Sequence, residues 1–131
     1  MSFNFIYNSI DPKELETEFL KTYYQNMINL GLSANLGLFD EKCNCLINNQ
    51  EFIGAYNILV KMAQQNIHKY QYKYLQGNLQ KTQNGFIITV SGICQPVNFQ
   101  NLHYGDLHFS EVFYLSNQYP YKIINYISHY F

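Results

Sequence analysis

Glu111 is the carboxylate in this chain with the clearest potential for acid–base chemistry. It falls in a segment of alternating residues, so one face of the expected strand combines this glutamate with four apolar side chains: Leu107, Phe109, Phe113 and Leu115. A carboxylate in such surroundings has a raised pKa and can donate or accept a proton near neutral pH. The alternative, which we favour, is a structural glutamate whose carboxylate is hydrogen-bonded by a neighbouring tyrosine or lysine.

Two cysteines and two histidines could be combined into a zinc site, as Cys43-x-Cys45 with His103-x4-His108. Common zinc sites separate paired ligands by two to four residues, and we expect these two thiols to face opposite ways from one strand. We therefore expect no metal and no other cofactor, with the thiols in the core and the imidazoles at the surface.

Tyrosines at every second position, Tyr70, Tyr72 and Tyr74, predict a strand with three rings on one face. Such a row can stack nucleic-acid bases. Without a basic surface around it, the row is better explained as sheet packing or as part of a protein interface.

The composition argues against several classes of function. Charged residues make up 13% of the 131 residues and the net charge is −1, so the chain lacks the basic surface that nucleic-acid binding requires. No apolar run is long enough to span a bilayer, and the scattered glycines form no phosphate-binding loop. Three cysteines without an N-terminal secretory signal favour a reduced intracellular compartment. The length predicts a single domain, residues 1–131.

The elements that must position these residues begin with helices. Asp11 can cap a first helix that starts at Pro12 and ends at Gly31. A short second helix is expected over 33–39. The apolar stripe of the first helix repeats at i+4, as a helix that packs on a core requires. Together with the later helix that begins at Gly54, it is expected to bury six residues: Phe19, Tyr23, Met27, Ile58, Leu59 and Met62.

Strands dominate the rest of the chain. Residues 43–47 predict a short strand followed by a tight turn at Asn48-Asn49. After residue 68 the apolar period changes from 3.6 to 2, and Asn84-Gly85 is the strongest hairpin signal. The segments 106–116 and 121–131 predict the last two strands, joined by a turn over 117–120.

These last strands are apolar on both faces. Val112 and Tyr114 lie on the face opposite Glu111, and in the final strand Ile123 and Ile127 are expected opposite Ile124 and Tyr126. An antiparallel sheet with one wet face should alternate more cleanly. We therefore expect a sheet covered twice, by helices on one face and by a second copy or a related domain on the other.

The order and spacing of these parts resemble the nuclear transport factor 2-like family. Its members start the helix after the first hairpin with F-x-G, which is F-I-G at 52–54 here. The run F-L-K-T-Y-Y at 19–24 is similar to the family's first helix, and Phe109 and Phe113 match its F-x-x-x-F strand. The resemblance extends over residues 14–127.

This resemblance implies an α+β fold in which a strongly curved antiparallel sheet wraps around N-terminal helices and leaves a cone-shaped cavity. Relatives that use the cavity as an enzyme pocket, such as ketosteroid isomerases, place a catalytic aspartate late in the first short strand. The matching residues here are Leu46, Ile47 and Asn48, none of which can abstract a proton at neutral pH. We therefore predict that the chain is not an enzyme, with a pocket enzyme or small-ligand binder that uses Glu111 as the alternative.

The family's transport factor carries GDP-bound Ran into the nucleus and binds phenylalanine-rich nucleoporin repeats. The resemblance places its tryptophan–glutamate pair for Ran at Ile47 and Asn48, and its acidic loop at 96–100, where this chain has no acid. Its nucleoporin-binding tryptophan falls near Pro12, and this chain has no tryptophan. Because charged and aromatic anchors dominate interface energy, we do not expect Ran binding by the family's mode.

We therefore predict a protein-binding module of the transport-factor type, present in the cytoplasm and the nucleus. Its expected partners are a second copy or a larger related domain, and nucleoporin repeats. A structural dimeric subunit is a further alternative. The predicted partner-binding residues are Ile47, Asn48, Phe99 and Tyr104. The predicted dimer-interface residues are Tyr70, Tyr72, Tyr114 and Tyr126.

Overall fold

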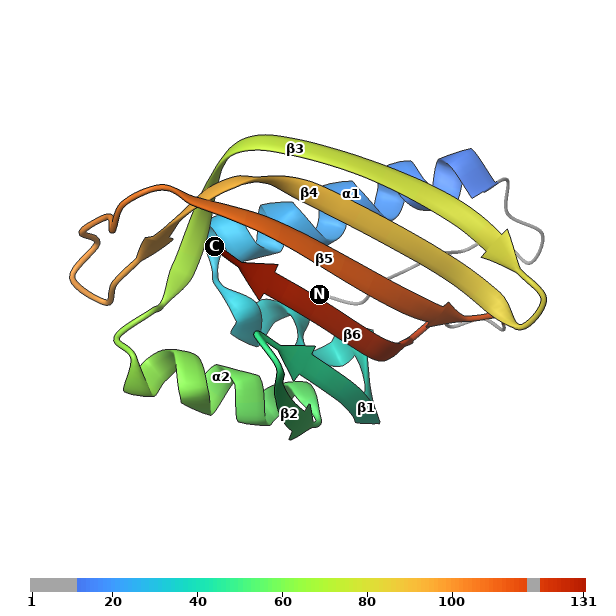
Figure 1. Cartoon of the computed structure of the whole chain (residues 1–131), viewed down its shortest axis with the longest axis horizontal. Coiled ribbons are helices and arrows are strands. Elements are labelled where there is room, and N and C mark those ends of the chain that lie inside the picture. Colours follow the sequence, from blue (N-terminus) through green and yellow to red (C-terminus); the bar gives the residue numbers. More distant parts are fainter. Residues whose placement is uncertain (1–11, 118–120) are drawn as a thin grey trace.

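A computed structural model describes residues 12–117 and 121–131 of the chain (Figure 1). The predicted cap at Asp11 and most of the predicted turn over 117–120 lie outside these residues. The elements in chain order are α1 (Pro12–Asn29), the 3-10 helix η1 (Leu32–Leu38), β1 (Phe39–Ile47), β2 (Gln50–Ile53), α2 (Ala55–Gln64), β3 (Lys69–Thr82), β4 (Gly85–Val97), β5 (Leu107–Ser116) and β6 (Ile123–Tyr130).

The six strands form one sheet in the order β2-β1-β6-β5-β4-β3. Four of the five pairings are antiparallel, and β1 pairs with β6 in parallel. Figure 1 shows the long strands β3 and β4 bending over α1, which lies on the inner side of the sheet. The α+β fold with a strongly curved sheet around N-terminal helices is thereby confirmed, except that the sheet is mixed rather than wholly antiparallel.

The core lies between α1 and the concave face of the sheet. The i+4 stripe of α1 is buried as predicted, with Phe19 fully enclosed. The ring of Phe19 meets Phe113 of β5 edge-on, with ring centroids 4.8 Å apart, and Tyr23 meets the same ring at 4.9 Å. Of the residues expected from α2, Ile58 and Met62 are buried and Leu59 is partly buried against the core.

The curvature of the sheet depends on a close approach between β3 and β4. A side chain at Gly92 would overlap the backbone carbonyl of Tyr74 on the neighbouring strand, so only glycine fits there. The register between the two strands shifts between Tyr72 and Tyr74, which marks a β-bulge beside this glycine. Bulges of this kind bend a strand and increase its twist.

The same bulge corrects the prediction of a continuous tyrosine row. Tyr70 is buried and Tyr72 is half-buried, but Tyr74 is 54% exposed because the extra residue turns it away from the core. A second register shift, between β5 and β6, leaves Ile124 as an extra residue of β6 without a partner on β5. Ile123 and Tyr126 therefore share the core face, and not Ile123 and Ile127 as predicted.

The outer face of the sheet is not covered by helices in the described part of the chain. The helix α1 packs against β3 and η1, and α2 packs against η1, β1 and β2. Along most of β5 the side chains alternate between buried and half-buried, so its outer face is only partly exposed to solvent. None of the described helices combines the length and the apolarity that crossing a membrane requires.

Replacing Phe19 with alanine should lower the free energy of unfolding by about 3–5 kcal/mol, because it leaves a cavity among fully buried rings. Chemical denaturation of the purified protein measures this. The matched control is Phe131→Ala, since Phe131 is 73% exposed and its loss should change stability far less. An unchanged midpoint in Phe19→Ala would contradict the packing of α1 against β5.

Candidate functional site

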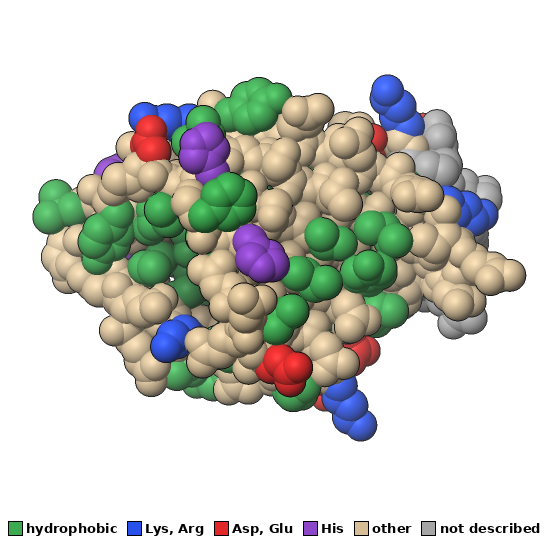
Figure 2. Space-filling view, viewed as in Figure 1, with side chains coloured by type: hydrophobic (Ala, Val, Ile, Leu, Met, Phe, Trp, Pro, Cys, Tyr) green, Lys and Arg blue, Asp and Glu red, His purple; other side chains and the backbone are tan. Residues whose placement is uncertain are grey.

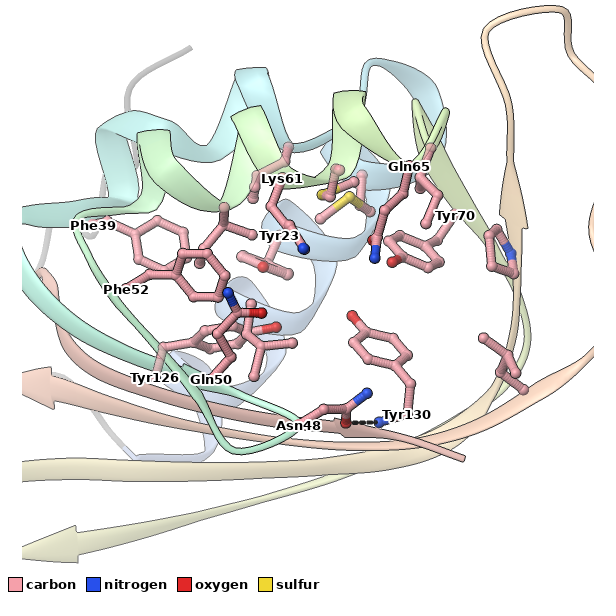
Figure 3. A pocket seen from close by; sticks show the side chains of 18 residues that line it. Tyr23, Phe39, Asn48, Gln50, Phe52, Lys61, Gln65, Tyr70, Tyr126 and Tyr130 are labelled. Atoms are coloured by element: carbon pink, nitrogen blue, oxygen red, sulfur yellow. Dashed lines mark hydrogen bonds between the residues drawn. The ribbon is translucent and has the colours of Figure 1, made fainter.

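A cavity of about 340 Å³ opens between the concave face of the sheet and the helices (Figure 3). Its walls come from the helices α1, η1 and α2 and from all six strands. The long strands contribute the start of β3, the end of β4, the start of β5, and the middle and end of β6. Ile47 and Asn48, predicted to bind a protein partner, line this cavity at the end of β1. Tyr70 and Tyr126, predicted at a dimer interface, line it as well.

Four tyrosines make the deep part of the cavity polar but uncharged: Tyr23, Tyr70, Tyr126 and Tyr130. Burial raises the pKa of each above the ordinary value of 10.0, so all four remain phenols at physiological pH. Tyr70 and Tyr130 stack with their ring centroids 5.5 Å apart and an angle of 12° between the planes. Figure 3 shows the Tyr130 hydroxyl directed into the open volume.

Glu111 lies behind this wall and is not among the residues that line the cavity. Its side chain is 2% exposed, and its carboxylate accepts hydrogen bonds from the Tyr24 hydroxyl, at 2.8 Å, and from the Tyr126 hydroxyl. Burial raises the pKa of Glu111 from 4.5 to about 7, and the two phenolic hydrogen bonds lower it in part. The structural interpretation of Glu111 fits this geometry, with tyrosines as its partners.

The mouth of the cavity carries hydrogen-bond donors. Lys61 and Gln65 reach in from α2, while Gln50 and Asn48 stand on the hairpin opposite (Figure 3). The Oδ1 atom of Asn48 accepts a hydrogen bond from the backbone N–H of Tyr130 at 2.9 Å. Because its oxygen is engaged there, the Asn48 amide presents its NH₂ group to the cavity. Lys61 carries the only charge among the described residues that line this volume.

The prediction that four tyrosines form a dimer interface conflicts with the structure for three of them. Tyr70 and Tyr126 are buried in the core, and Tyr72 packs edge-on against Tyr24 with ring centroids 5.0 Å apart. All three face the concave side: Tyr70 and Tyr72 are two residues apart on β3, and the extra residue Ile124 in β6 places Tyr126 on the same face as Ile123. Only Tyr114, half-buried on the other side of β5, lies on the outer face.

The predicted anchors Phe99 and Tyr104 lie on the loop between β4 and β5, away from the core. Phe99 is 50% exposed, and its ring stacks on His68 with centroids 4.8 Å apart. The Tyr104 hydroxyl donates to the Asn66 carbonyl at 3.1 Å. Asn98 holds the loop by accepting two backbone N–H bonds with its side chain. The structure thus presents both rings at the surface, whereas Ile47 and Asn48 line the cavity.

The thiols of Cys43 and Cys45 face the same way, contrary to our expectation, because residues two apart in a strand share a face. Their sulfur atoms lie 3.7 Å apart in the core. His103 bonds Gln95, and His108 stacks on Phe131, both at the surface. Within 12–117 and 121–131, no three His, Cys, Asp or Glu side chains gather as a metal site would require.

Lys61, Gln65 and Tyr130 were missed as cavity residues. A signal for the first two exists in the sequence, since Lys61 and Gln65 stand three and seven positions after the buried Ile58. That spacing places them beside the apolar stripe of α2. Tyr130 offers no such signal, because its place in the cavity depends on the bulge in β6.

Comparison with known proteins shows a family match and several solved structures with the same fold. Residues 15–130 match the sequence profile described as the nuclear transport factor 2 (NTF2) domain. The sequence has no significant match among curated proteins. Nuclear transport factor 2 (Ntf2) from Cryptosporidium parvum is 24% identical, with a TM-score of 0.73 over 94% of this chain and 100% of that one.

Two further solved structures share the fold at 13% identity. The Mtr2–Mex67 M domain complex from C. albicans matches with a TM-score of 0.71, over 92% of this chain and 94% of that chain. A protein from Xanthomonas campestris, provisionally assigned as a polyketide cyclase, matches with a TM-score of 0.72, over 92% and 93%. The fold is therefore shared by transport proteins and by a protein that is provisionally assigned as an enzyme.

Replacing Glu111 with glutamine should remove a pH dependence of stability. Since the pKa of Glu111 is about 7 in the folded protein and near 4.5 when exposed, the folded state binds more protons between these values. The free energy of unfolding should therefore fall as the pH rises from 4.5 to 7, by an amount on the order of 3 kcal/mol. Denaturation at both pH values measures the slope.

Glu111→Gln should lack this slope, because its amide stays neutral and can still meet both phenols. The control Glu51→Gln, at an exposed position of β2, should keep it. A slope of the same size in Glu111→Gln would mean that another group is responsible.

Proposed function

This chain belongs to the nuclear transport factor 2 domain family, and from that premise we propose that it is a protein-binding module of the transport-factor type. It pairs through the outer face of its sheet with a second copy or with a related domain. It acts as a nucleocytoplasmic adaptor in the cytoplasm and the nucleus. The observation that carries this proposal is the apolar outer face of β1, β6, β5 and β4, which no described helix covers.

We name the outer apolar patch by its five residues: Leu46, Ile87, Val112, Tyr114 and Ile127. All are half-buried within the domain. Val112 of β5 stands opposite Ile127 of β6, which stands opposite Leu46 of β1, so three apolar side chains form one row across the sheet. Ile87 and Tyr114 form the adjacent pair. Cross-strand rows of this kind offer a continuous apolar surface to a partner.

The charge distribution supports pairing. In the face shown in Figure 2, apolar, histidine and other polar side chains occupy the centre, while lysine and acidic side chains lie toward the margins. Interface cores are depleted of charged residues in the same way. With a net charge of −1 on each chain, two copies would repel one another only weakly.

Relatives lend support to pairing with a related domain. The C. albicans and Chaetomium structures are described as Mtr2 together with Mex67, so members of this fold occur in complexes with a second protein. Burial of about 2,000 Å² or more is typical of an obligate interface.

Binding of GDP-bound Ran by the family's mode is not part of this proposal. The positions of the family's aromatic–carboxylate pair, Ile47 and Asn48, contribute to the cavity wall, and residues 96–100 include no acid. The exposed ring of Phe99 on that loop, stacked on His68, is a better candidate for apolar contact with nucleoporin repeats.

A pocket protein of the same fold is the second candidate function. It is favoured by the open cavity of about 340 Å³ and by the likeness to a provisionally assigned polyketide cyclase. The position of Glu111 behind Tyr126 argues against direct acid–base catalysis by that carboxylate. Binding without chemistry therefore suits the cavity better.

Replacing Val112 with arginine should prevent pairing, because it places an unpaired charge at the centre of the outer apolar patch. Sedimentation at micromolar concentration should show a dimer for the wild type and a monomer for Val112→Arg. The matched control is Val60→Arg, at an exposed position of α2, which should remain dimeric.

A wild-type monomer that captures a related domain, with capture lost in Val112→Arg, would support the heterodimer form. A well-folded wild-type monomer that captures no related domain would overturn the proposal.

Replacing Phe99 with aspartate should weaken capture of a phenylalanine-rich nucleoporin repeat peptide by about tenfold or more, as the loss of an interface anchor does. The thermal midpoint should not change, since Phe99 is half exposed. Fluorescence anisotropy with a labelled peptide measures the affinity. The control Leu30→Asp, exposed at the end of α1, should bind as the wild type does. Equal binding by Phe99→Asp would exclude this loop as the anchor.

A further inference from the structure

We propose that the cavity is a binding site for a small carboxylic acid with an aromatic or alicyclic body, whose carboxylate pairs with Lys61 at the mouth. This goes beyond protein pairing, because the cavity opens on the concave side of the sheet and the outer apolar patch lies on the other. Both sites can therefore be occupied together.

The size and walls of the cavity set the body of the ligand. A volume of about 340 Å³ lies at the small end of the range of roughly 300–1,000 Å³ that is usual for ligand pockets. The walls between mouth and floor are aromatic and aliphatic side chains: Met27, Phe39, Phe52, Ile58 and Met62. Such walls favour a compact ring that can pack offset or edge-on against their aromatic rings.

The charge at the mouth sets the polar end of the ligand. Lys61 is half-buried, and in the part of the chain that the structure describes no carboxylate forms an ion pair with it. A partly desolvated ammonium group attracts an anion more strongly than one in open water. A lining whose described residues include one lysine and no other charged side chain matches a monoanion better than a phosphate dianion.

Amide donors complete the anion-binding end. The NH₂ group of Asn48 faces the cavity because its oxygen is held by the backbone of Tyr130. Gln65 caps the C-terminal end of α2 four residues after Lys61, and Figure 3 shows their nitrogen atoms directed into the same space. A carboxylate that reaches Lys61 can therefore also accept amide hydrogen bonds.

The floor of the cavity excludes a cationic or strongly acidic second end. The phenols of Tyr70 and Tyr130 are neutral, so they can meet a hydroxyl or carbonyl group on the far side of a ring. Among the described residues, no aspartate or glutamate lines the cavity to bind a cation. An acid with its ring inward and its carboxylate at the mouth satisfies both ends.

The test uses trans-cinnamate and its neutral counterpart cinnamide as probes of the full chain, with affinities from amide chemical-shift titrations. Cinnamate should bind in the millimolar range or tighter and shift the amides of α2 and of the Asn48 turn. Cinnamide should bind about tenfold more weakly. Lys61→Gln should weaken cinnamate about tenfold and leave cinnamide unchanged, which is the signature of a lost charge.

Two control variants separate this site from the rest of the molecule. Lys81→Gln removes an exposed lysine from the far end of β3 and should bind cinnamate as the wild type does. Val112→Arg should also bind it normally, so loss of pairing and loss of ligand binding are distinguishable. If Lys61→Gln is unstable, Ile47→Trp serves instead, since its larger side chain should fill the cavity and abolish binding of both probes.

Three outcomes would overturn the proposal. One is no shift with cinnamate at millimolar concentration. Another is equal affinity for cinnamate and cinnamide. The third is shifts that map to the outer face and not to the cavity.

Discussion

The hydrogen bonds from Tyr24 and Tyr126 to Glu111 are the interaction on which the interior depends. They join α1 to β5 and β6 across the buried layer, and they fix the position of the Tyr126 ring that forms part of the cavity wall. A buried carboxylate without these partners would be costly. With these partners, the Glu111 carboxylate links the helix α1 to the sheet. The same hydrogen bonds fix the Tyr126 ring, so they stabilise both the core and the wall of the cavity.

Much of the fold was predictable because local patterns and tertiary packing agree. The stripe through Phe19 and Tyr23, the turn at Asn48-Asn49 and the Asn84-Gly85 hairpin are each specified within a few residues, and each is confirmed. The cavity residues were only partly predictable. One extra residue near Tyr74 and another near Ile124 reverse the alternation beyond them, and nothing local marks either bulge. Tyr126 was assigned to the wrong face for that reason, whereas Tyr70 and Tyr72 precede the bulge of β3 and were simply assigned to the wrong face.

The two faces of the sheet have different surfaces. The concave face encloses a cavity with one lysine and a set of neutral phenols, which resembles a ligand pocket. The convex face presents a row of apolar side chains without helical cover, which resembles half of an interface. Because they use opposite sides of the same strands, one chain can serve both purposes, and relatives of this fold include transport factors and proteins assigned to enzymes.

The parallel pairing of β1 with β6 has a consequence for the folding pathway. It brings Asn48 beside Tyr130, 82 positions along the chain, so this pairing joins residues that are far apart in sequence. Closing so long a loop costs entropy that is recovered only when the last strand docks. The hairpin of β3 and β4 is local and can form early, whereas the cavity mouth can exist only after β6 has joined β1. A folding intermediate without β6 would retain the curved hairpin and would lack the ligand site.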